Sequence, residues 1–172
     1  MKILVIQNKM GIGDMVIYLP FIEAISKKFN TPISILVKES SKANQFLKDN
    51  NFIDKIIILE RDNNLENGKH EGLNGSYNLV RDLKQYGFEK VFIFNSSFRF
   101  NLIARTAGIK DIHQYPLFQK KNQHVIEAAK ELLKKNLGLN VESDPKISVS
   151  KQCVKKARFE YKINNDEKNI LL

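Results

Sequence analysis

Cysteine is nearly absent from this sequence of 172 residues, in which Cys153 is the only one. A single cysteine cannot form a disulfide within the chain, and no cysteine pair or histidine–cysteine cluster has the spacing of metal ligands. The composition therefore excludes a disulfide-stabilised secreted module and a zinc-binding motif. We expect a protein of the cytosol that binds no metal.

Long apolar runs are missing as well. The apolar run at residues 3–6 is short and gives way to polar residues, so it lacks the length and the cleavage site of a signal peptide. No other segment approaches the apolar length of a membrane-spanning helix. We expect a cytoplasmic protein, for which the sequence allows peripheral contact with the inner face of the cytoplasmic membrane.

Acidic residues are too few to balance the basic ones. The chain has 19 Asp and Glu against 28 Lys and Arg, a formal net charge of +9. Such an excess fits an anionic partner, which can be a nucleic acid, a phosphorylated sugar or an acidic lipid. The lysines are spread along the chain, however, and no nucleic-acid-binding signature is present. We therefore favour a solvated basic surface and expect no nucleic-acid partner.

Short apolar runs alternate with helical patterns along the chain. The runs have the character of strands buried on both faces of a parallel sheet. We expect a three-layer, Rossmann-like α/β domain with a mainly parallel sheet, helices on both faces and residues 3–6 as the central strand. Strands are predicted at residues 3–6, 32–37, 55–59, 90–94 and 111–113, and helices at residues 14–28, 41–50, 77–86, 98–107 and 125–136.

The sequence predicts one domain over residues 1–150, with a polar surface loop at residues 61–75. Residues 151–172 differ: a basic helical stretch and a polar turn lead into a last apolar run at 169–172. A terminal strand without a following helix leaves an open edge. We interpret 151–172 as a linker helix and the first strand of a missing C-terminal domain. The alternative is that this strand pairs with the sheet of residues 1–150.

A glycine-containing turn, Gly11-Ile12-Gly13, lies between the first strand and the first helix. This is the usual place of a ligand site in an open parallel sheet. The glycines let a ligand approach backbone N–H groups at a helix N-terminus, which favours negative charge. Val16 occupies the position of the third glycine in G-x-G-x-x-G, and no P-loop lysine follows. Both dinucleotide binding and P-loop chemistry are therefore disfavoured.

Asp14, which follows this turn, has two compatible interpretations. Aspartate is a preferred N-cap, and the helix dipole stabilises its carboxylate. The same carboxylate can accept the proton of a substrate hydroxyl when a new C–O bond forms. The residues alone do not separate a cap from a general base.

The run at 2–6, the turn Gly11-Ile12-Gly13-Asp14 and Pro20 follow one another in an order that resembles a known family. It is similar to the start of the ADP-heptose:lipopolysaccharide heptosyltransferases of glycosyltransferase family 9. Residues 52–57, 88–93 and 123–139 resemble later strands and a later helix of that family. Gln7 departs from it, because an arginine is common there. The Gly-Asp turn with its downstream proline is the most specific part.

The resemblance implies the N-terminal, acceptor-binding half of a GT-B glycosyltransferase. It implies inverting, metal-independent transfer from a nucleotide-sugar donor such as ADP-heptose, with Asp14 as the general base. The acceptor is then a lipopolysaccharide, a related envelope glycan or a lipid-linked sugar, and no other cofactor is needed. The missing C-terminal domain is the donor-binding partner, so we expect this chain alone to be inactive. A non-catalytic glycan- or anion-binding domain is the alternative.

Three further residues are candidates for substrate binding, together with Gly11, Ile12 and Gly13. Arg99 follows the fourth strand and can hold a phosphate or a sugar, or it is a solvated arginine at a helix start. Arg61 follows the third strand and can meet an acidic acceptor, although a loop arginine is usually exposed. His124 matches the family pattern, but a surface histidine in a first turn is the simpler interpretation.

Overall fold

Five parallel strands form one sheet in the computed structural model, which describes residues 1–9, 11–48, 50–61, 68–117, 124–145, 147 and 151–163. The order is β3-β2-β1-β4-β5, so β1 is central. All pairings are parallel. The strands are β1 (Ile3–Gln7), β2 (Ile33–Val37), β3 (Ile53–Ile58), β4 (Lys90–Ile93) and β5 (Asp111–Gln114). The predicted parallel sheet with residues 3–6 at its centre is confirmed.

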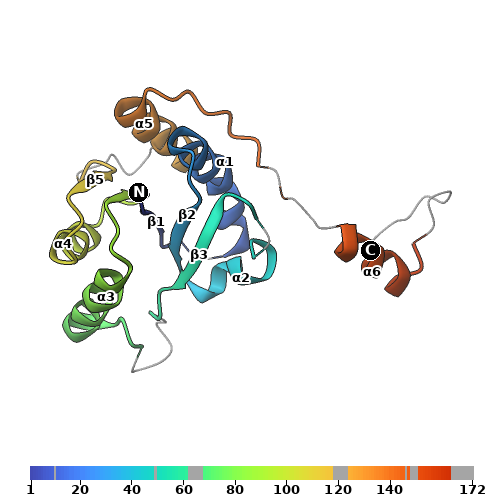
Figure 1. The fold of residues 1–172 in the computed structure, drawn as a ribbon, viewed down its shortest axis with the longest axis horizontal. Coiled ribbons are helices and arrows are strands. Elements are labelled where there is room, and N and C mark those ends of the chain that lie inside the picture. The colour runs from blue at the N-terminus through green and yellow to red at the C-terminus, as the bar shows by residue number, and fades with distance from the viewer. Residues whose placement is uncertain are drawn as a thin grey trace.

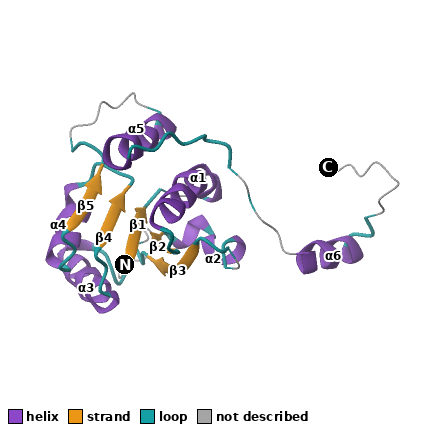
Figure 2. Cartoon of the chain, turned by 45° about the horizontal axis from the view of Figure 1, so that its top comes forward, coloured by secondary structure: helices purple, strands orange, loops and turns teal. Residues whose placement is uncertain are grey.

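Helices cover both faces of the sheet and give three layers (Figures 1 and 2). The main helices are α1 (Ile12–Phe29) and α5 (Val125–Leu137) on one face, and α3 (Gly72–Tyr86) and α4 (Phe98–Thr106) on the other. In β1, Ile3 and Val5 join the core under α1, whereas Leu4 and Ile6 join the core under α3 and α4. Because alternate side chains of a strand point to opposite faces, both sets must be apolar.

The first helix begins earlier than the sequence pattern indicates. Gly11 is the N-cap residue, and Asp14 is the third residue of α1. Gly11 has a φ of 98°, which glycine adopts without a steric penalty. The interpretation of Asp14 as the N-cap is therefore wrong. Its carboxylate still lies in the first turn, where the helix dipole stabilises a negative charge.

The segment between β2 and α3 differs most from the prediction. A 3₁₀ turn (Glu39–Ser41) and the four-residue α2 (Ala43–Phe46) replace the helix predicted at 41–50. Helix α3 begins at Gly72, well before the predicted residue 77, so the loop predicted at 61–75 ends at Glu71. The first turn of α3 contains Gly72 and Gly75. In the sequence, glycines so close together predict a loop.

The last described helix, α6 (Lys151–Glu160), agrees with the predicted basic helix and has no buried residue. Figure 1 shows it apart from the three layers. The strand predicted at 169–172 lies outside the described residues, so the division at residue 150 and the missing C-terminal domain stay predictions. In the part of the chain that the structure describes, no helix has the length and apolar character needed to cross a membrane.

Candidate functional site

The candidate site lies at the carboxyl edge of the sheet, where the parallel strands end on the same side. The turn after β1 brings Gly11, Ile12 and Gly13 to this edge, and Ile12 is 50% exposed. Asp14 is half-buried beside them. No described side chain caps the N-terminus of α1. One carboxylate and the N–H groups of a helix start therefore lie together at the surface.

Two buried tyrosines lie below this turn. Tyr18 is one helical turn after Asp14, and Tyr115 follows β5; their rings lie 5.0 and 6.0 Å from that of Phe94. Burial raises the pKa of Tyr18, the Tyr115 hydroxyl lowers it in part, and the charge of Asp14 raises it. Burial is the main cause that raises the pKa of Tyr115, and the neighbouring Tyr18 hydroxyl raises it further. Neither hydroxyl has a hydrogen bond of full geometry to a described residue.

Gln7 ends β1 next to the same turn and is completely buried. Neither atom of its amide has a hydrogen-bond partner among the residues described. A buried polar group without a partner costs about 1–3 kcal/mol. The Gln7 amide therefore lowers the stability of the chain at the end of β1. The sequence marked it only as a departure from the heptosyltransferase pattern.

Amide side chains link the ends of β1, β4 and β5. Asn95 donates to Asn8 Oδ1 at 3.1 Å. The Nε2 of Gln114 donates to the carbonyl oxygens of Asn95 at 3.1 Å and Ser97 at 2.9 Å. These bonds fix the loop that leads from β4 into α4, and hence the position of Arg99 in the first turn of that helix.

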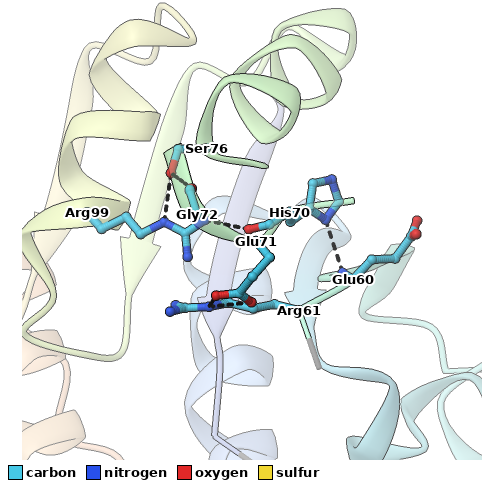
Figure 3. A network of polar contacts seen from close by, with 7 residues as sticks. All are labelled: Glu60, Arg61, His70, Glu71, Gly72, Ser76 and Arg99. Carbon is cyan, nitrogen blue, oxygen red and sulfur yellow. Dashed lines mark hydrogen bonds and ion pairs between the residues drawn. The ribbon is translucent and has the colours of Figure 1, made fainter. Parts of the chain in front are cut away.

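The guanidinium of Arg99 is held against the start of α3 (Figure 3). Its Nε donates to Ser76 Oγ at 2.9 Å, and its Nη2 donates to the carbonyl oxygen of His70 at 2.6 Å. Its Nη1 is buried without a partner among the described residues. Burial lowers the pKa of Arg99, the charge of Arg61 lowers it further, and Glu71 raises it in part. An arginine remains charged under such shifts, so Arg99 offers a fixed cation with an unused donor.

Arg61 leaves the end of β3 and lies beside this cation. Its Nε is 3.3 Å from Oε1 and 3.2 Å from Oε2 of Glu71. Both side chains of the pair are more than a third exposed, so the pair adds little stability. The structure therefore brings Arg61 and Arg99 into one basic cluster, whose charge Glu71 offsets only in part.

His70 organises this cluster, and sequence reasoning missed it. Its side chain is 2% exposed. Its Nδ1 accepts a hydrogen bond from the N–H of Glu60 at 3.0 Å, and its Nε2 lies 3.1 Å from Asp82 Oδ2. Because Nδ1 accepts, the proton of the neutral ring is on Nε2 and is donated to Asp82. The ring thus joins β3 to α3 and sets the carbonyl oxygen that Arg99 binds.

The structure does not bring all the predicted site residues together. No contact in the described part of the chain joins Asp14 to Arg61 or Arg99. His124 is the exposed N-cap of α5, and its Nδ1 accepts from the N–H of Ile126 at 3.4 Å. That capping bond gives His124 a local role in its own helix. Among the described residues, no group of three or more His, Cys, Asp or Glu side chains could hold a metal ion.

A separate groove of about 590 Å³ lies beside the C-terminal half of α1, where Leu139 and Val141 pass close to Ala24 and Lys28. Parallel strands and the helices that follow them run in opposite directions, so this groove lies toward the amino edge of the sheet. It is therefore remote from Asp14 and from the two arginines, and we do not assign it to the candidate site.

No family model matches the chain, and no curated protein matches it. Solved structures do match. A family 9 glycosyl transferase from Veillonella parvula has a TM-score of 0.70 and 16% identity, covering 96% of this chain and 51% of its own. The E. coli ADP-heptose lipopolysaccharide heptosyltransferase II has a TM-score of 0.64 and 16% identity, with coverages of 96% and 52%. E. coli heptosyltransferase WaaC, solved with ADP-2-deoxy-2-fluoro heptose, has a TM-score of 0.55 and 16% identity, with coverages of 84% and 51%.

The chain spans about half the length of each of these structures. At such identities, the likeness concerns the fold and leaves the chemistry to be argued from the site. Solved structures that share this fold include a family 9 glycosyltransferase and ADP-heptose heptosyltransferases, and this chain has the fold of about half of such a protein.

Proposed function

We propose that this chain is the acceptor-binding half of a heptosyltransferase-type glycosyltransferase. The reaction moves a sugar from a nucleotide-sugar donor, such as ADP-heptose, to a lipopolysaccharide or a related envelope glycan. The observation that carries the proposal is the carboxyl edge of the sheet. There, a first-turn carboxylate and a cluster of two arginines lie on a fold shared with heptosyltransferases.

Asp14 is the general base in this proposal. The acceptor hydroxyl gives its proton to the Asp14 carboxylate while its oxygen forms a bond to the anomeric carbon of the donor sugar. The bond from that carbon to the diphosphate breaks, and the nucleoside diphosphate leaves with the electron pair. Attack opposite the leaving group inverts the anomeric centre. No metal takes part in this step.

Arg99 and Arg61 bind an anionic group of the acceptor. Arg99 is partly exposed and positively charged, and Arg61 adds a second positive charge beside it. A guanidinium binds carboxylate or phosphate oxygens through short, charge-assisted hydrogen bonds. The positively charged groups that stabilise the leaving diphosphate belong to the other half of the protein.

The alternative function is a glycan- or anion-binding domain without turnover. The same arginine cluster supports it, because binding needs no base and no donor. The two functions differ in what Asp14 does: a binding domain tolerates its replacement, whereas the transferase does not.

A transfer assay tests the proposed function. A protein that carries both halves is mixed with ADP-heptose and a deacylated, water-soluble lipopolysaccharide core, and released ADP is measured. We expect release that depends on the acceptor, and none from the 172-residue chain alone, because donor contacts are missing. Robust transfer by the chain alone, or no release by the protein with both halves, would show the proposal wrong.

Replacing Arg99 with glutamine should raise the acceptor KM by about 10- to 100-fold, because a charge-assisted hydrogen bond contributes about 1.5–3 kcal/mol. The value of kcat should change much less, since the contact is made in both the ground state and the transition state. The matched control is Arg105→Gln, an exposed arginine in the last turn of the same helix. Equal acceptor KM values for the two variants would remove Arg99 from the acceptor site.

A further inference from the structure

The outer face of α3 carries two exposed apolar side chains followed by two cations. Leu73 is 90% exposed and Tyr77 is 70% exposed. Arg81 and Lys84 are exposed as well. Spacings of three and four residues place all four on one side of a helix. The buried side of α3, with Gly75, Leu79 and Leu83, faces the sheet instead.

Helix α4 repeats this arrangement. Phe98 is 63% exposed and Leu102 is 53% exposed, one turn apart. Arg105 is exposed one turn further on. The buried side of the helix consists of Phe100, Ile103 and Ala104, and α4 contains no acidic residue. Its outer face is therefore apolar at the start and basic at the end, as in α3.

The two outer faces belong to one surface. Both helices cover the same face of the sheet and lie side by side (Figures 1 and 2). The hydrogen bond from Arg99 Nε to Ser76 Oγ joins them at their first turns. Since both turn their buried sides to the sheet, their exposed sides point the same way. We name this the α3–α4 surface, which consists of Leu73, Tyr77, Arg81, Lys84, Phe98, Leu102 and Arg105.

The charge of the α3–α4 surface is of one sign. The only acidic residue of either helix, Asp82, lies on the side away from Leu73 and Tyr77, where it contacts Lys69 at 2.5 Å and His70 at 3.1 Å. Burial alone would raise the pKa of Asp82, but hydrogen bonds from Lys69 and His70 more than offset this and lower it. The exposed apolar groups are thus flanked by Arg81, Lys84 and Arg105 without an opposing carboxylate on the same faces.

We propose that the α3–α4 surface docks onto the surface of an anionic lipid bilayer. Exposed Leu, Tyr and Phe side chains beside Lys and Arg are the composition that inserts at the boundary between headgroups and acyl chains. The cations pair with anionic headgroups, each adding to the attraction. A second copy of this chain is a poorer occupant, because two identical basic faces repel each other. The surface borders Arg99 but contains none of Asp14, Arg61 and Arg99, so docking is measured as vesicle binding, separately from sugar transfer.

Vesicle co-sedimentation of the purified chain tests this proposal. The probes are vesicles of phosphatidylcholine alone and of phosphatidylcholine mixed with phosphatidylglycerol. We expect binding to the anionic vesicles that weakens as salt is added. The double variant Leu73→Ser, Phe98→Ser should bind at least about tenfold more weakly, because two inserting side chains are lost. Both positions are exposed, so circular dichroism and the thermal midpoint should remain those of the parent chain.

Phe159→Ser is the matched control. Phe159 is 89% exposed on α6, which is also basic, so it tests whether vesicle binding comes from that helix. The control should bind as the parent does. The proposal is overturned if only Phe159→Ser loses binding, if the double variant binds as the parent, or if phosphatidylcholine alone binds equally well. The proposal also fails if the chain does not bind vesicles and instead self-associates or binds an RNA oligonucleotide through these residues.

Discussion

Replacing Asp14 with asparagine is expected to lower the maximal rate of sugar transfer by about 10²- to 10⁴-fold in a protein that carries both halves. The carboxamide has nearly the shape of the carboxylate but cannot accept the proton of the acceptor hydroxyl, and general-base catalysis contributes a factor of this size. The acceptor KM should change much less. The measurement is steady-state transfer at saturating donor and varied acceptor.

Stability separates this catalytic effect from damage to the fold. Asp14 is not the N-cap, so Asp14→Asn removes only a favourable charge in the first turn of α1, which is about 0.3–1 kcal/mol. The matched control is Glu23→Gln, which removes a carboxylate further along the same helix, where it pairs with Lys27. The control should keep the full transfer rate. If Asp14→Asn also kept it, Asp14 would be a structural residue and the proposed catalyst would be lost.

Replacing Gly75 with alanine is expected to lower the free energy of unfolding by about 3 kcal/mol. A Cβ built at Gly75 lies 2.1 Å from the carbonyl carbon and 2.6 Å from the carbonyl oxygen of His70. These are backbone atoms that cannot swing aside, so α3 and the loop must separate, and such overpacking costs 1–3 kcal/mol or more. The displaced carbonyl is also the acceptor for Arg99. Urea unfolding followed by circular dichroism measures the loss.

Gly13→Ala provides the comparison. Gly13 is also helical, but nothing lies within 4 Å of a Cβ built there. Alanine should therefore leave stability unchanged or raise it by up to about 1 kcal/mol, since glycine is the poorer helix former. Similar losses at both positions would contradict the close approach of α3 to His70.

The sheet could be predicted from the sequence because each strand is buried on both faces. Its side chains must then be apolar in succession, and a short run such as 3–6 stands out from its polar neighbours. The helix predicted at 41–50 is interrupted at Lys42, whose left-handed φ of 53° separates the 3₁₀ turn from the four helical residues of α2. The start of α3 was missed because Gly72 and Gly75 indicate a turn locally, whereas Gly75 is required by the approach of His70.

The candidate site could be predicted only where position along the chain implies position in space. Asp14, Arg61 and Arg99 each follow a strand, and the carboxyl ends of parallel strands meet at one edge. His70 follows no strand directly, and its role depends on contacts with Glu60 and Asp82 that have no spacing pattern in the sequence. Every residue has a backbone carbonyl, so a hydrogen bond such as that from Arg99 to the His70 carbonyl cannot be predicted from the residue type of the acceptor.

The central place of β1 has a consequence for how the chain folds during synthesis. β1 leaves the ribosome before the other four strands, and its neighbour β2 follows soon after. Its other edge is closed only by β4, in which Lys90 pairs with Ile3, 87 residues earlier in the chain. Pairings of such long range are slow to form, and an unpaired strand edge is prone to aggregation. The nascent chain therefore carries a mostly apolar strand with one open edge until β4 has been made.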